Sequence, residues 1–168
     1  MTKESFKILF EKHFDKLRNY LYYRIGNEEL ATDIAQEAFM RIWEKQLIKS
    51  DDNAIGLVYK IANDLLVSKY RRQQVEIKFQ KSFSSNQFDY SPEEEFQFDE
   101  LQIKYEKAIS ALSENERIVF LMSRNDELKY NEIAERLNLS VKAVEKRMSK
   151  AIAFLKEEMR EFLIKSNN

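Results

Sequence analysis

The chain of 168 residues has no cysteine, one histidine, one proline and two glycines, and each shortage excludes a class of structure or chemistry. Without cysteine, neither a disulfide framework nor a thiolate zinc site can form. His13 alone cannot build a histidine-based metal cluster, and we expect no metal and no other cofactor. Two glycines and one proline are too few for the tight turns of a β-sandwich or barrel, so the chain should be all-α.

Long apolar runs are also missing from the sequence. No run approaches the roughly 18 residues that a membrane-spanning helix needs, and the first five residues lack the apolar core of a signal peptide. Hydrophobic residues still make up 43% of the chain, which argues against wholesale disorder. We therefore expect a soluble, cytoplasmic protein with no direct membrane insertion.

Charge is distributed unevenly along the chain, although the formal net charge is only −1. Residues 1–81 carry 15 basic and 12 acidic side chains, whereas residues 82–101 carry six acidic and no basic ones. Residues 102–168 are mildly basic again, with 13 basic and 11 acidic side chains. The near-zero net charge therefore results from a short acidic stretch that offsets the basic excess of its two flanks. A basic excess is typical of proteins that bind nucleic acid.

The acidic stretch 82–101 is also rich in small polar residues and contains the only proline, Pro92. This composition is typical of a flexible linker. We expect two small helical domains, at 1–77 and 93–166, joined by a linker at 78–92. A solvated loop within a single domain is the alternative.

Three stretches of the first domain repeat apolar residues at helical spacing. The first covers 6–25 and should end at Gly26, where a left-handed residue can close a helix. The second covers 31–42, and the third covers 54–65. One set of aromatic residues in these stretches is favoured as core rather than binding surface: Trp43 and the tyrosines at 20, 22, 23 and 59.

The second domain begins with an amphipathic stretch at 101–112, followed by a capping-box pattern in which Ser113 and Glu116 satisfy each other's backbone donors. A further helix is expected over 130–137, then a short turn, and a last helix from Val141. Ser140 is a good N-cap for that last helix. Its core-facing positions are expected to be Val141, Val144, Met148, Ile152 and Leu155.

The other face of the last helix is polar and mostly basic. An apolar back and a basic front are what a helix needs to lie in the major groove of DNA, where phosphate contacts set register and base contacts specify sequence. The residues expected to contact DNA are Lys142, Glu145, Lys146, Arg147, Ser149 and Lys150.

Two motifs in the first domain are the sequence DIAQEAF (33–39), followed by Trp43, and the sequence VYKIA (58–62). Together they resemble domain 2 of bacterial sigma factors of the sigma-70 family, in the extracytoplasmic-function (ECF) group. The resemblance implies that the first motif's exposed face docks on the clamp coiled coil of the polymerase β′ subunit. The docking residues would be Asp33, Gln36, Glu37, Met40 and Arg41.

The same resemblance implies that the following helix contacts the minus-ten promoter element. The residues implied are Lys60, Asn63, Asp64, Val67, Arg71 and Arg72. The chain differs from the family pattern at Leu57, where tryptophan is usual, and at Asp64, where asparagine is usual. An acid at this place repels phosphate but can accept a hydrogen bond from a cytosine amino group.

The second domain resembles domain 4 of the same family through the sequences LKYNEIA (128–134) and SVKAVEKR (140–147). Family domain 4 contacts the minus-thirty-five element. Ala143 stands where threonine is usual. The resemblance implies a promoter-specificity subunit, with partners in core RNA polymerase (the β′ clamp coiled coil and the β flap), promoter DNA and an anti-sigma factor.

Three rival functions remain open at this point. An autonomous helix-turn-helix regulator would bind a palindromic site as a homodimer without polymerase. A helical scaffold would leave its charged faces merely solvated. An enzyme has the least support, because the sequence offers no nucleophile–base set and no glycine-rich phosphate loop, so we expect no catalytic residues.

Overall fold

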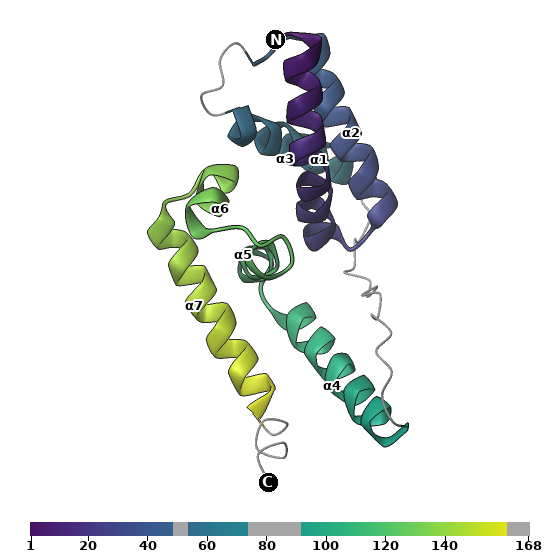
Figure 1. Cartoon of the computed structure of the whole chain (residues 1–168), viewed down its shortest axis with the longest axis vertical. Helices are drawn as coiled ribbons and strands as arrows, with labels where there is room; N and C mark the ends of the chain where they lie inside the picture. Colours follow the sequence, from purple (N-terminus) through teal and green to yellow (C-terminus); the bar gives the residue numbers. More distant parts are fainter. Residues whose placement is uncertain (49–53, 74–91, 161–168) are drawn as a thin grey trace.

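The computed structural model describes residues 1–48, 54–73 and 92–160, except for the side chains of 70–73 and 92–100. All regular structure in this part of the chain is helical, which confirms the predicted all-α fold (Figure 1). The elements are α1 (Lys3–Ile25), α2 (Glu28–Glu44), α3 (Ala54–Gln73), α4 (Pro92–Ala111), α5 (Glu114–Arg124), α6 (Tyr130–Leu137) and α7 (Val141–Glu158).

Helices α1, α2 and α3 pack together as the first helical group. Gly26 ends α1 with a φ of 65°, a left-handed conformation that glycine adopts without steric cost. Asn27 then caps α2, its side chain accepting a hydrogen bond from the Leu30 N–H at 2.9 Å. This tight joint brings α2 back alongside α1, where Phe39 lies almost fully buried among the aromatic rings of α1.

The second helical group contains α4, α5, α6 and α7, with α7 in contact with the other three. Asn138 closes α6 in a left-handed conformation, and Ser140 caps α7 by accepting from the Ala143 N–H at 3.2 Å. The helix-turn-helix predicted from the sequence is therefore present as α6, a turn and α7. Ser113 caps α5, accepting from the Glu116 N–H.

The end of the predicted linker differs from the sequence interpretation by one residue. Because α4 begins at Pro92, that residue is helical rather than part of the predicted linker, and residues 93–101 form the start of the same helix. Proline suits the first helical position, and the three glutamates that follow, residues 93–95, suit the positive end of the helix dipole. The rest of the predicted linker, 78–91, lies outside the described residues.

The two helical groups touch each other at two places, α1 against α5 and α3 against α6 (Figure 1). Buried apolar side chains from both groups belong to one hydrophobic cluster. Residues far apart in sequence thus face each other across the boundary. In the described residues, no helix is long and apolar enough to cross a membrane.

Candidate polymerase and nucleic-acid interface

The predicted docking face of α2 lies in solvent. Its apolar stripe is buried against α1 and α3, which turns the opposite side of the helix outward. Met40 is 57% exposed, a large value for an apolar side chain. Four of the five predicted docking residues are exposed and Glu37 is half-buried; the exposed four are Asp33, Gln36, Met40 and Arg41.

Two cations hold the Glu37 carboxylate on this face. Arg41 Nη2 lies 2.7 Å from one carboxylate oxygen, one helical turn away, and Lys69 Nζ of α3 lies 3.8 Å from the other. The charge of Glu37 is therefore partly compensated within the chain. Trp43, which the sequence favoured as core, is 37% exposed, although its ring packs 5.0 Å from that of Phe6. Trp43 extends the surface around Met40.

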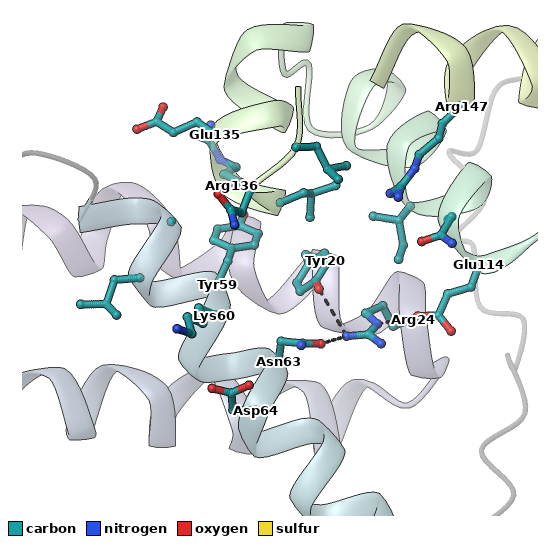
Figure 2. A pocket seen from close by; sticks show the side chains of 17 residues that line it. Tyr20, Arg24, Tyr59, Lys60, Asn63, Asp64, Glu114, Glu135, Arg136 and Arg147 are labelled. Carbon is teal, nitrogen blue, oxygen red and sulfur yellow. Dashed lines mark hydrogen bonds and ion pairs between the residues drawn. The ribbon is translucent and has the colours of Figure 1, made fainter. Parts of the chain in front are cut away.

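The predicted minus-ten face of α3 has a different environment. Lys60, Asp64 and Val67 are exposed and Asn63 is half-buried; the side chains of Arg71 and Arg72 lie outside the described residues. A cavity of about 720 Å³ separates this face from the second helical group. It is lined on one side by Lys60, Asn63 and Asp64, and on the other by Arg136 of α6 and Arg147 of α7 (Figure 2).

Arg24, in the last turn of α1, connects the two sides of this cavity. Its Nη1 donates to the side-chain Oδ1 of Asn63 and, at 3.3 Å, to the Tyr20 hydroxyl, while its Nε donates to Glu114 at 2.7 Å (Figure 2). Glu114 belongs to α5 of the other group. A predicted minus-ten residue is therefore linked, through one guanidinium, to the second domain.

A second polar contact joins α1 to the loop after α5. Asp126 accepts hydrogen bonds on one carboxylate oxygen from Asn19 Nδ2 at 2.8 Å and from the Tyr23 hydroxyl at 3.2 Å. Burial raises the pKa of this carboxyl, and burial followed by the nearby Asp126 charge raises the pKa of Tyr23. Arg117 of α5 is buried and donates its Nε to the Tyr23 carbonyl at 3.0 Å.

The predicted minus-thirty-five face of α7 is open to solvent. Val144 and Met148 anchor the helix in the core, as expected, whereas Val141 is 41% exposed at the first turn and does not face the core. Arg147, on the flank, is half-buried and directs its side chain toward the cavity (Figure 2). The remaining predicted contacts are exposed: Lys142, Glu145, Lys146, Ser149 and Lys150.

Sequence reasoning missed the polar residues at the boundary between the groups. The contacts of Asn19 and Tyr23 with Asp126 join residues more than 100 positions apart. Tyr20, Tyr23 and Tyr59 are buried, as predicted, but they lie where the two groups meet. The only available signal was the run of polar and aromatic residues on one side of α1 near its end.

Comparisons with known proteins match both helical groups. The family description "Sigma-70 region 2" matches residues 9–75, and "Sigma-70, region 4" matches residues 102–155. The chain is 27% identical to the ferric citrate uptake sigma factor FecI of Escherichia coli K12, over 88% of this chain and 87% of FecI. It is 26% identical to the ECF RNA polymerase sigma factor SigW of Bacillus subtilis, over 95% of this chain and 91% of SigW.

One solved structure has a similar fold over nearly the whole chain. It is the sigma factor RpoE of Bartonella quintana, crystallised with the anti-sigma factor NepR. The TM-score is 0.62 at 19% sequence identity, and the match covers 94% of this chain and 98% of RpoE. At this identity the likeness is one of fold.

Proposed function

The chain belongs to the sigma-70 family as an ECF-type RNA polymerase sigma factor, which binds core polymerase and directs promoter-specific initiation, and on that premise we propose which surface performs each step. One observation carries the assignment. A single chain combines an exposed, mixed-charge α2 face with a helix-turn-helix that has a polar, mostly basic front.

The α2 face docks on core polymerase. Gln36 and Met40 offer an amide and a thioether one helical turn apart, and Glu37 with Arg41 adds a charge pair. A rigid helix with such groups on one side suits a partner helix, because residues three and four apart lie on the same face. The adjoining exposed Trp43 adds a large aromatic contact, of the kind enriched at energetically important sites.

The DNA contacts belong to α3 and α7. Lys60, Asn63, Asp64 and Val67 meet the minus-ten element, and Asp64 gives that contact a preference for a cytosine amino group. The exposed front of α7 enters the major groove at the minus-thirty-five element, with Ser140 fixing the start of the helix. The two domains correspond to residues 1–77 and 93–166.

Energy considerations make polymerase a required partner. Separating about ten base pairs costs about 14 kcal/mol, at about 1.4 kcal/mol per stacking step. One bidentate base contact returns only about 1–3 kcal/mol. The isolated chain therefore cannot melt a promoter, and much of the driving force must come from the polymerase.

Two further assignments follow from the same proposal. RpoE, which shares this fold, is held by an anti-sigma factor, and we assign this chain a protein inhibitor of the same kind. Since its targets are polymerase and DNA, the chain acts in the cytoplasm as a non-enzymatic subunit.

Run-off transcription from a genomic promoter library, with purified bacterial core polymerase, tests the proposal. Adding the protein should produce a discrete set of new start sites, and Gln36→Ala combined with Glu37→Ala should abolish them. The control combines Lys7→Ala with Glu11→Ala, two side chains on α1 that are each 63% exposed, and should leave the start sites unchanged.

The same assay distinguishes the rival functions. DNA binding by the isolated protein without any new start site would overturn the sigma assignment in favour of an autonomous regulator. Equal loss in the α1 control and the α2 variant would overturn the docking assignment, because it would show a general effect on the fold.

A further inference from the structure

The side-chain amide of Asn63, on α3, has a charged partner within the first helical group. Arg24 Nη1, in the last turn of α1, donates a hydrogen bond to Asn63 Oδ1 (Figure 2). A guanidinium has five N–H donors and no acceptor, so only the oxygen of the amide can face it. The NH2 group of Asn63 is then turned away from Arg24. The chemistry of Arg24 therefore decides which end of the amide remains available.

Arg24 is itself held against the interior of the first helical group. Its Nη1 also donates to the Tyr20 hydroxyl at 3.3 Å, and its Cζ lies 5.8 Å from the centroid of the Tyr20 ring. That ring is buried and packs against Tyr59, with 5.0 Å between the two centroids. A cation seated over a buried aromatic ring and bonded to its hydroxyl keeps a defined position. The Asn63 amide therefore has a stable partner.

Asp64 follows Asn63 in the sequence and has the opposite hydrogen-bonding character. An ionised carboxylate only accepts hydrogen bonds, and Asp64 is exposed. Asn63, with its oxygen occupied by Arg24, offers N–H donors. Both side chains line the same cavity of about 720 Å³ (Figure 2). This part of α3 therefore presents a donor next to an acceptor.

The four DNA bases differ in how they match such a pair. An unpaired base is recognised through its Watson–Crick edge. In cytosine and adenine, that edge has an amino donor next to a ring nitrogen that accepts. In thymine and guanine, a carbonyl oxygen takes the place of the amino group, and the ring nitrogen carries a hydrogen. A base of the second kind, held in the same position, would set donor against donor and acceptor against acceptor.

We propose that Arg24 is a specificity-determining residue, which holds Asn63 as a hydrogen-bond donor to the ring nitrogen of the same unpaired base whose amino group Asp64 accepts. The inference rests on the proposed function of the α3 face. Arg24 is a positioning residue, because it acts through Asn63. Without Arg24 the amide can turn, and either its oxygen or its NH2 group then faces the base. Discrimination between the two kinds of base falls, whereas docking through α2 is unaffected.

Run-off transcription from a promoter library randomised across the minus-ten element tests this inference. The measured quantity is the ratio of start sites with cytosine or adenine to those with thymine or guanine at each position. Asn63→Ala identifies the position that Asn63 contacts, because discrimination is lost there. Wild-type protein should show a ratio of about ten at that position, the range of one good base contact. Arg24→Leu should reduce it to about two to three, the share left to Asp64.

The ratio reports the contact even when a variant folds poorly, because a loss of folded protein lowers all start sites alike. Arg24→Lys keeps a group that only donates and should keep the wild-type ratio. Arg18→Leu removes an arginine of the same helix that pairs with Asp15 at 3.5 Å, and should leave the ratio unchanged. Glu114→Gln should also leave it unchanged, because Glu114 accepts from Arg24 Nε rather than Nη1.

The contact can also be measured without polymerase. In the free protein, the carbon-13 NMR signal of the Asn63 side-chain carbonyl should move upfield in Arg24→Leu, because a hydrogen bond to its oxygen is lost, and stay in place in Arg18→Leu. An unmoved carbonyl signal or an unchanged base ratio in Arg24→Leu would overturn the inference, as would a wild-type preference for thymine or guanine at the Asn63 position. If wild-type protein yields no start sites, the proposed function fails and base reading fails with it, whereas the carbonyl signal still decides whether Arg24 holds the amide.

Discussion

Helices α2 and α3 are neighbours in one bundle, yet their assigned binding faces are presented in opposite ways. The α2 face is open to solvent: Met40 is 57% exposed, and Glu37 pairs with Arg41 on the same helix. The α3 face looks into a cavity whose far wall is the second helical group, and its Asn63 is engaged by Arg24. Both faces belong to amphipathic helices, and they differ in how easily a large partner can reach them.

This difference separates the roles of the two faces. No described residue of the second group pairs with Glu37 on the α2 face, whereas α6 of the second group contacts α3. Variants of the two faces should therefore fail at different steps, polymerase binding for α2 and promoter reading for α3.

The largest effect is expected from Met40→Glu on α2. A carboxylate in the centre of the docking face should weaken polymerase binding by about 30-fold or more, the range of a central interface residue. Binding of labelled protein to core polymerase measures this. Ile8→Glu on α1, also at a position 57% exposed, is the control; equal weakening in both variants would contradict a localised docking face.

A smaller loss, of about tenfold in promoter-dependent transcription, is expected from Asn63→Ala on α3. The estimate follows from about 1–3 kcal/mol for one good base contact. Polymerase binding should stay at the wild-type level, which separates this variant from Met40→Glu. Ser68→Ala, exposed further along α3, is the control, and reduced polymerase binding by Asn63→Ala would contradict the division between the faces.

His13 offers a spectroscopic measure of how α6 lies relative to α1. Its pKa is lowered from 6.5 to about 4, first by burial and then by the positive charges of Arg136 on α6 and of Lys12 and Lys16 on α1. Between these values the unfolded chain binds more protons, so the His13 contribution to stability is complete above pH 6.5 and is lost as pH falls toward 4.

Removing the charge of Arg136 removes the largest cause after burial, so the His13 pKa should rise above 4 in Arg136→Gln. Because the chain has one histidine, a single imidazole signal in an NMR titration reports it. The Glu116→Gln variant should keep the wild-type value. A His13 pKa that stays near 4 in Arg136→Gln would show that α6 has no part in the shift.

The smallest effect is expected from Arg41→Ala. This arginine pairs with Glu37 in an exposed helix position, where such pairs contribute about 0.3–0.5 kcal/mol. Thermal unfolding should therefore shift only slightly, and any change in polymerase binding should weaken with added salt. An effect on polymerase binding as large as that of Met40→Glu would show that Arg41 is a central contact of the docking face rather than a peripheral one.

Local signals in the sequence predicted much of the fold. Gly26 ends α1 and Ser140 begins α7 as expected, because capping depends on residues within one turn of the helix end. The failures are also physical. Pro92 was interpreted as part of a linker, although proline followed by glutamates is equally a helix start. Val141 fits the apolar spacing but lies in the first turn, beyond the reach of the core.

The candidate surfaces were predictable where a helix has one polar side, as on α2 and α7. The polar contacts between the two helical groups were not, because their partners lie about 90 to 107 residues apart. Asp126 looks like any loop carboxylate in sequence, and Arg24 looks like a cation at a helix end. Their pairing depends on how two domains pack, which no local pattern records.

The single hydrophobic cluster that spans both helical groups has a consequence for heat stability. Small domains bury a smaller share of their surface, so each group alone should melt at a lower temperature than the two together. The free protein should unfold in one cooperative calorimetric step. A partner that binds only the folded chain adds to this stability by mass action, so the melting temperature should rise with polymerase concentration.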